Sequence, residues 1–229
     1  MDDGKQSPRT VSDVMTHTVI AIGRDAPFKE IIQMMAQWKV SALPVVEGEG
    51  RVIGVVSEAD LLPKEEFRDS DPSRLDQRRR LADLAKAGAL VAWEVMSSPA
   101  ITVHPDAPLA QAARIMATRQ VKRLPVVDAQ MMLQGVVSRS DLLKVFLRSD
   151  EDIAEEARRE VVDRLFPDKT VTVAVEEGVV TLAGRIRDTS LVPVAARLVR
   201  AVEGVVDIRF EPTSLPKRGP EPPSVGPMF

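Results

Sequence analysis

Residues 43–62 read LPVVEGEGRVIGVVSEADLL, and residues 124–143 read LPVVDAQMMLQGVVSRSDLL. The two stretches are separated by 124 − 43 = 81 positions, and no insertion interrupts the match. The pair Val14-Met15 recurs at 95–96 with the same offset. Agreement over several blocks identifies a duplicated structural unit, which organises the first two thirds of the 229-residue chain.

Each copy predicts the element order β-α-β-β-α. Apolar runs at 18–22 and 100–103 predict a first strand, and the following Asp-Ala-Pro predicts a helix start with Asp as cap and Pro in the first turn. The last strand of each copy ends at Ser57 or Ser138. The predicted apolar helix faces are Phe28, Ile31, Ile32 and Met35, and Leu109, Ala112, Ala113 and Met116. A copy this small buries its sheet poorly alone, so we expect a pseudo-symmetric pair.

Composition argues against several classes of function. The chain has no cysteine, which excludes disulfides, thiolate metal sites and cysteine nucleophiles. Its two histidines have no carboxylates at metal-ligand spacing, and neither a Walker-type loop nor a nucleophile with an adjacent base is present. The net charge of −3 gives no general attraction to nucleic acid. We expect a cytoplasmic binding protein without catalysis, metal or nucleic acid, since no signal peptide or membrane span is evident.

The segments that carry chemistry run from Gly54 to Asp60 and from Gly135 to Asp141, each with the pattern Gly-x-x-Ser-x-x-Asp. The pattern places a hydroxyl and backbone N–H groups at the start of a helix, where partial positive charge favours phosphate. The carboxylate three residues later can accept hydrogen bonds from the two adjacent hydroxyls of a ribose. Ser-x-x-Asp is also a capping box that needs no ligand. Two occurrences in a duplicated unit favour ligand binding, and both roles can coexist.

Residues 11–146 resemble a tandem pair of CBS domains, also called a Bateman module. The resemblance rests on Val14-Met15-Thr16 and Val95-Met96-Ser97, on the Leu-Pro-Val-Val strands and on the two Gly-x-x-Ser-x-x-Asp segments. It implies a homodimer that binds AMP, ADP, ATP or S-adenosylmethionine as a regulatory ligand between the repeats, with no obligatory cofactor. The implied contacts are Asp60 and Asp141 to ribose, Ser57 and Ser138 to phosphate, and Val19, Ile20, Ala100 and Ile101 to the base.

The two copies differ in charge near these motifs. Lys122 and Arg123 precede the second Leu-Pro-Val-Val, and Arg139 follows the second motif serine. The matching residues of the first copy are Ser41, Ala42 and Glu58. We assign the three cations to the Asp141 site, which is therefore expected to bind a charged nucleotide more tightly than the Asp60 site. Trp38 and Trp93 are expected to be packing anchors.

These features divide the chain into segments. We expect a flexible N-terminus at 1–10, repeats at 11–63 and 91–147, a charged helical linker at 64–90, a smaller domain at 151–211 and a disordered Pro-rich tail at 212–229. Within the linker, Ser73 to about Ala87 is predicted to be helical, with a favourable pair between Asp76 and Arg80. The run Arg78-Arg79-Arg80 is more typical of a solvated helix face than of a nucleic-acid contact.

The smaller domain predicts the order α-β-β-α-β, with a helix pair on a three-stranded sheet. Strands are predicted at 171–175, at 179–187 after a turn at Gly178, and at 206–210. The first helix follows Ile153, Ala157, Val161 and Leu165, and the second follows Leu191, Val194, Ala195, Leu198, Val199 and Val202, with Gly204 as its C-cap.

Positions 151–211 resemble a BON domain, on the pieces Gly178-Val-Val-Thr-Leu-x-Gly184 and Val202-Glu-Gly-Val205. The resemblance implies a binding module that is often linked to phospholipid surfaces. The second helix has only Arg197 and Arg200 as basic residues, which favours core packing over a membrane surface.

The fold class expected for the whole chain is mixed α/β (α+β). The leading hypothesis is a regulatory protein that senses an adenosine-type ligand and transmits binding to the BON domain or to an unknown protein partner. The alternative is a membrane-associated or envelope-associated interaction protein, in which the BON domain makes the contact and the CBS pair is a scaffold.

Overall fold

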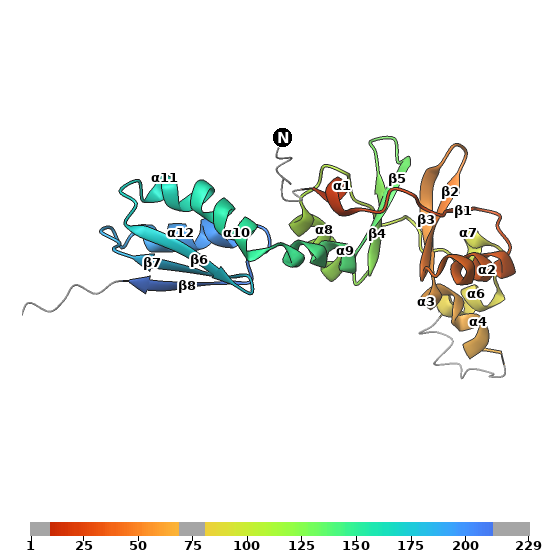
Figure 1. The fold of residues 1–229 in the computed structure, drawn as a ribbon. Coiled ribbons are helices and arrows are strands. Elements are labelled where there is room, and N and C mark those ends of the chain that lie inside the picture. The colour runs from red at the N-terminus through yellow and green to blue at the C-terminus, as the bar shows by residue number, and fades with distance from the viewer. Residues whose placement is uncertain (1–9, 69–80, 213–229) are drawn as a thin grey trace, which may run out of the picture. The chain divides into compact units, whose positions relative to one another are not determined.

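The computed structural model describes residues 10–68 and 81–212 (Figure 1). The chain divides into two compact units, Met1–Lys144 and Val145–Phe229. The predictions for residues 1–9, for the linker at 69–80 with its arginine run, and for the tail at 213–229 lie outside the described residues. Mixed helices and strands in both units confirm the expected fold class.

The first repeat contains a small three-stranded sheet. Its elements are α1 (Val11–Val14), β1 (Ile22–Gly23), α2 (Phe28–Trp38), β2 (Ala42–Glu47), β3 (Arg51–Ser57), α3 (Glu58–Leu61) and α4 (Pro63–Glu66). β2 pairs with β1 in parallel and with β3 antiparallel. β1 is shorter than the predicted strand at 18–22, because residues 18–20 leave the ladder and line a cleft instead.

The second repeat follows the same plan. Its elements are α7 (Ala92–Val95), α8 (Leu109–Thr118), β4 (Arg123–Val127), β5 (Leu133–Ser138) and α9 (Arg139–Leu143), after which comes the 3-10 helix η1 (Lys144–Leu147). β4 and β5 pair antiparallel. The predicted strand at 100–103 is reduced to a single bridge between Val103 and Val126, since residues 100–101 line a second cleft.

The long helices begin two residues later than predicted. Pro27 and Pro108 are the N-caps of α2 and α8, so the expected Asp cap and first-turn Pro are wrong. An extended ψ at each Pro (147° and 145°) delays the first helical residue. Ile31 and Met35 are buried as predicted, as are Leu109, Ala112 and Met116. Ile32 (45% exposed) and Ala113 are not in the core, because the buried face is narrower than the sequence pattern.

The opening segment of each repeat packs against the other repeat, which confirms the pseudo-symmetric pair. Thr16 exchanges backbone hydrogen bonds with Val136 at 2.9 and 3.0 Å. In the equivalent place, Ser97 exchanges them with Val55 at 2.9 and 3.1 Å. The core around the first sheet accordingly combines residues of both repeats, Ile22, Ile31, Met35, Leu43, Val45 and Val56 with Ala89, Ala92 and Val95.

The motif glycines permit this interlock. A Cβ at Gly135 would lie 2.7 Å from Sδ of Met15 and 2.9 Å from the carbonyl oxygen of Thr16. A Cβ at Gly54 would overlap the Met96 side chain in the same manner. The repeated Val-Met pair and the motif glycine are therefore the two sides of one contact, which occurs twice.

The described part of the linker forms α6 (Leu81–Gly88), within the predicted helix. Lys64 of α4 binds its C-terminal end, because Nζ donates to the carbonyls of Ala87 at 3.0 Å and Ala89 at 2.7 Å. The same Nζ lies 4.8 Å from the centroid of the Phe28 ring. An ammonium at a helix C-terminus complements the orphan carbonyls and the helix dipole. α6 is thus anchored to the first repeat.

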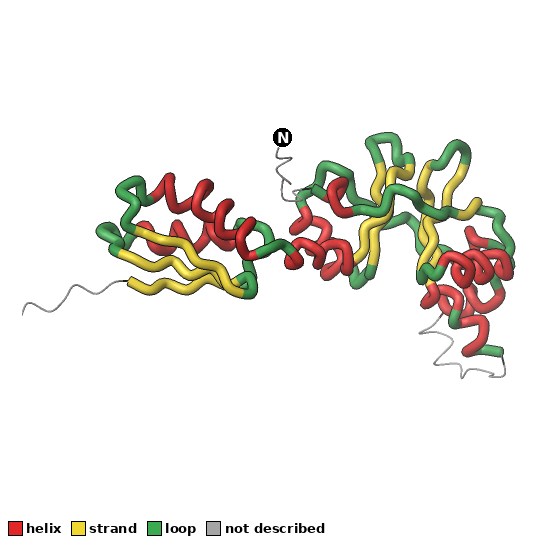
Figure 2. Tube along the Cα trace, in the orientation of Figure 1, coloured by secondary structure: helices red, strands yellow, loops and turns green. Residues whose placement is uncertain are grey.

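The second unit has the predicted order α-β-β-α-β. Its elements are α10 (Asp150–Ala157), the π-helical η2 (Arg158–Val162), α11 (Asp163–Leu165), β6 (Val171–Glu176), β7 (Val179–Gly184), α12 (Leu191–Arg200) and β8 (Asp207–Pro212). β7 pairs antiparallel with β6 and parallel with β8. The helices lie on one face of this sheet (Figure 2). β7 ends at Gly184 rather than 187, and the C-cap of α12 is Ala201 rather than Gly204.

The π-helical turn explains which residues of the first helical stretch are buried. Ile153 and Ala157 face the core as predicted. The wider turn brings both Val161 and Val162 inward, and Phe166 follows them. Leu165 was predicted on this face and is only partly buried, because the additional residue rotates the helix.

Candidate ligand-binding clefts

Two clefts lie between the repeats, and each takes residues from both. The first, called the Asp60 cleft, has a volume of about 240 Å³ and is lined by Ser57 and Asp60 of the first repeat and by Ala100 and Ile101 of the second. The second, called the Asp141 cleft, has a volume of about 390 Å³ and is lined by Ser138 and Asp141 of the second repeat and by Val19 and Ile20 of the first. Each motif therefore faces the opening segment of the other repeat.

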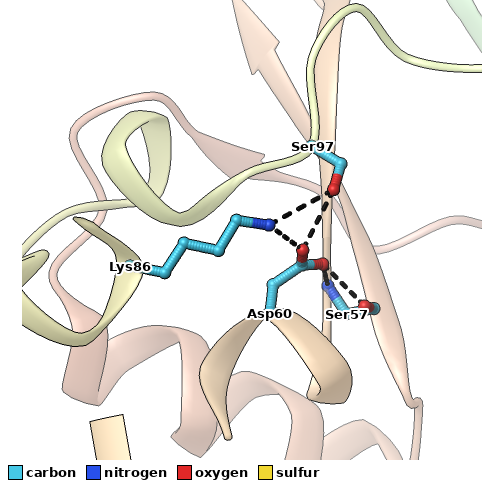
Figure 3. A network of polar contacts seen from close by, with 4 residues as sticks. All are labelled: Ser57, Asp60, Lys86 and Ser97. Atoms are coloured by element: carbon cyan, nitrogen blue, oxygen red, sulfur yellow. Dashed lines mark hydrogen bonds and ion pairs between the residues drawn. The ribbon is translucent and has the colours of Figure 1, made fainter. Parts of the chain in front are cut away.

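Asp60 is held by a network of polar side chains (Figure 3). Ser57 caps α3, and its backbone N–H and hydroxyl donate to Oδ2 of Asp60 at 2.8 and 2.6 Å. Oδ1 accepts hydrogen bonds from Ser97 Oγ at 3.0 Å and from Lys86 Nζ. Four donors thus occupy the two carboxylate oxygens, and Asp60 is only 9% exposed. The network joins the first motif to α6 and to the opening segment of the second repeat.

Asp141 has equivalent capping contacts but a different cation. The backbone N–H and hydroxyl of Ser138 donate to Oδ2 at 2.9 and 2.6 Å, and Lys144 Nζ donates to Oδ1 at 2.8 Å. The Lys144 side chain is 59% exposed, whereas that of Lys86 is 20% exposed. Both motifs form capping boxes, so the capping interpretation is confirmed at both sites.

Both motif carboxyls have a pKa below the ordinary value of aspartic acid. Burial raises the pKa of Asp60, but the hydrogen bonds from Lys86 and Ser57 outweigh this effect and lower it. Burial likewise raises the pKa of Asp141, and the hydrogen bonds from Lys144 and Ser138 outweigh it. Each cleft therefore offers an ionised, fixed acceptor at neutral pH, which suits the paired hydroxyls of a ribose.

The structure corrects the predicted distribution of cations. Lys122 lines the Asp60 cleft, and Arg123 lines both clefts. Arg139 lines neither, and its Nε donates to the carbonyl of Val121 at 3.2 Å. The cause is the crossed packing, which turns the start of β4 toward the motif of the first repeat. The premise of tighter binding at the Asp141 site is therefore wrong for Lys122 and Arg139, whereas Arg123 does line that cleft.

Arg123 occupies a shared position between the clefts. Its Nη2 donates to Ser41 Oγ at 2.9 Å, which links the two repeats. Its Nε is buried and has no hydrogen-bond partner among the described residues. The permanent positive charge of this guanidinium, beside two clefts, can attract an anionic group of a ligand.

Trp38, Ser97 and Lys86 were not among the predicted site residues. Trp38 and Ser97 line the clefts, and Lys86 contacts Asp60. Trp38 lines the Asp141 cleft and is 50% exposed, and Trp93 is 47% exposed, so the expectation of packing anchors is wrong for both. Lys86 and Ser97 contact Asp60 from 26 and 37 positions away. Ser97 follows the repeated Val-Met pair and could have been found from the duplication, whereas nothing local distinguishes Lys86 from Lys64, the other lysine of the linker.

The apolar face of α12 packs into the core through Ala195 and Val199, as predicted. None of the helices within 10–68 and 81–212 has the length and apolar character needed to cross a bilayer. In the same ranges, no group of three or more His, Asp or Glu side chains is arranged to hold a metal ion.

Two interlocked repeats with crossed clefts, followed by a small α+β unit, define a tandem-repeat module with an accessory domain. The CBS domain family matches residues 11–64 and 91–148, and the BON domain family matches residues 149–210. The chain belongs to the CBS domain-containing proteins, and its tandem CBS pair is followed by a BON domain.

Relatives and solved structures match the CBS pair. The CBS domain-containing protein YhcV of Bacillus subtilis is 30% identical over 133 residues, which cover 58% of this chain and 82% of that protein. An uncharacterised protein of Methanocaldococcus jannaschii is 28% identical over 153 residues, covering 60% and 90%. The crystal structure of CBSX2, an Arabidopsis thaliana protein, in complex with AMP matches with a TM-score of 0.54 and 26% identity, over 61% of this chain and 97% of that one.

Proposed function

We propose that this protein is a regulatory binding protein that senses an adenosine-type ligand in the clefts of its CBS pair and catalyses no reaction. The ligand is an adenine nucleotide or S-adenosylmethionine. Its ribose binds Asp60 or Asp141, its phosphate lies beside the motif serine and Arg123, and its base contacts the backbone at 19–20 or 100–101.

The crossed arrangement of the clefts carries this proposal. Each cleft sets a serine and a buried, ionised carboxylate opposite an extended segment that lies outside the sheets. Such a segment can offer backbone donors and acceptors to a base, while the carboxylate accepts hydrogen bonds from sugar hydroxyls. CBSX2, a structural relative, has been solved with AMP, which supports the same ligand class here.

Calorimetry and thermal unfolding with AMP, ADP, ATP and S-adenosylmethionine test the proposal. A ligand present at 100 times its Kd stabilises the folded protein by about 2.7 kcal/mol. Asp60→Ala and Asp141→Ala should each remove binding at one cleft. Asp25→Ala is the matched control, because Asp25 has an 80% exposed side chain away from both clefts. If none of the four compounds binds the wild-type protein, the proposal is wrong.

We further propose that the CBS pair forms a homodimer through apolar side chains at the ends of its short helices. Leu62 and Leu143 occupy equivalent positions in the two repeats and are 64% and 61% exposed. Burying such surface against a second copy removes it from water. Light scattering should report a dimer for the wild-type protein and a monomer for Leu62→Ser with Leu143→Ser. Leu90→Ser, at a 69% exposed leucine outside this pair, is the control. A monomeric wild-type protein contradicts the proposal.

Transmission to the BON domain or to a protein partner is the last part of the proposal. The Asp141 motif begins α9, and η1 follows it directly along the chain. A ligand that replaces Lys144 on Asp141 therefore acts on the segment that leads into the second unit. Coupling of this kind is typically about 1–3 kcal/mol. Hydrogen exchange at residues 145–158 should change when AMP binds, and unchanged exchange at saturation would contradict transmission.

A further inference from the structure

Lys86 has no part in the proposed contacts, yet it forms an ion pair with the carboxylate of the first motif. It projects from α6 and donates to Oδ1 of Asp60, and its Nζ lies 3.4 Å from Ser97 Oγ (Figure 3). Its side chain is 20% exposed, and that of Asp60 is 10% exposed. An ion pair this sheltered is screened by water far less than a surface pair.

The contact has a direct consequence for any ligand that uses Asp60. The carboxylate already accepts four hydrogen bonds, two at each oxygen, which is its full capacity. Two ribose hydroxyls can bind only by replacing donors. The Ser57 donors belong to the cap of α3, so the replaceable donors are Lys86 and Ser97.

Displacing Lys86 leaves an ammonium group in a sheltered position without its carboxylate. An uncharged nucleoside offers no anion in exchange, so its binding carries the full penalty of the broken pair. A phosphorylated nucleoside supplies a phosphate that the released ammonium can bind. Lys122 and Arg123 line the same cleft and add positive charge, and its acidic side chains are Glu58 and Asp60 itself.

We propose that Lys86 is a specificity-determining residue of the Asp60 cleft, which makes the cleft select phosphorylated nucleosides over uncharged ones. The inference rests on the proposed function and concerns one cleft only. In the Asp141 cleft, the corresponding cation is Lys144, whose side chain is 59% exposed and can return to water when a ligand replaces it. The Asp141 cleft therefore lacks this contribution to selectivity.

The experiment compares AMP with adenosine in single-cleft proteins. An Asp141→Ala background isolates the Asp60 cleft, and Lys86→Met is introduced there. The ratio of the adenosine Kd to the AMP Kd should fall at least about tenfold, since adenosine no longer breaks an ion pair and AMP loses a cationic partner. Lys86→Gln repeats the test with a polar side chain, in case Lys86→Met does not fold.

The matched control is Lys144→Met in an Asp60→Ala background, where the ratio should change by less than about threefold. An unchanged ratio in both Lys86→Met and Lys86→Gln, with AMP bound, overturns the role of Lys86 and leaves the proposed function standing. A failure of AMP and adenosine to bind the wild-type protein and all variants overturns the proposed function itself, and the selectivity with it.

Discussion

Replacing Gly135 with alanine tests the interlock that forms both clefts. The new Cβ would lie 2.7 Å from Met15 Sδ and 2.9 Å from the Thr16 carbonyl oxygen. The methionine side chain can move, but the Thr16 backbone is held by two hydrogen bonds to Val136. Overpacking typically costs about 1–3 kcal/mol. We expect about 2–3 kcal/mol here, because one of the two crowded atoms belongs to paired backbone.

Tryptophan fluorescence during urea unfolding measures this effect, because Trp38 and Trp93 are the two tryptophans of the chain and both lie in the first unit. Adding Met15→Ala to Gly135→Ala should restore part of the lost stability, since the sulfur contact disappears and the Thr16 contact remains. Gly88→Ala is the control, because a Cβ there meets nothing within 4 Å. A Gly135→Ala protein as stable as the wild type would refute the reasoning.

Other predictions address charge and the second unit. Because the folded-state pKa of Asp60 is lowered, its stabilising contribution is complete at neutral pH and is lost as the pH falls below about 4. The difference in unfolding free energy between wild type and Asp60→Asn should therefore shrink at acidic pH, and a pH-independent difference contradicts this. Arg123→Met should weaken AMP binding about tenfold in each cleft, measured by calorimetry on the single-cleft variants. A loss in only one cleft would argue against a role of Arg123 in both. Asp150 accepts hydrogen bonds from the backbone N–H groups of Glu177 and Gly178, both at 2.8 Å. Asp150→Ala should therefore destabilise the second unit by about 1–3 kcal/mol and speed hydrogen exchange at the turn of Glu177 and Gly178, and unchanged exchange would contradict this.

Much of the local structure could be predicted from the sequence. Residues a few positions apart determine the strands around Leu-Pro-Val-Val, the serines at which the following strands end, and the capping boxes. Spacing and propensity therefore suffice to predict these features. The errors fall where packing outweighs local pattern. Ile32 lies on the predicted apolar face and is exposed, and Val162 is buried because a π-helical turn shifts the register of its helix.

The duplication also identified the motif residues of the candidate site, since two Gly-x-x-Ser-x-x-Asp segments share one offset. The duplication could not show which residues contact these motifs in the folded protein. Lys122 was assigned by proximity to its own repeat, whereas the structure places it in the cleft of the other motif. Lys86 reaches Asp60 across 26 residues from a linker helix that shows no motif.

The amino-acid order by itself determined that two copies exist, which elements each copy forms and which side chains cap the short helices, because those properties arise from neighbours along the chain. Tertiary packing alone decided that each motif faces the opposite copy and that Arg123 lies beside both clefts. It also decided that a partly buried lysine contacts one carboxylate and an exposed lysine contacts the other. These outcomes depend on how two sheets and a linker helix come together in space, and contacts between distant residues leave no periodic pattern in the sequence.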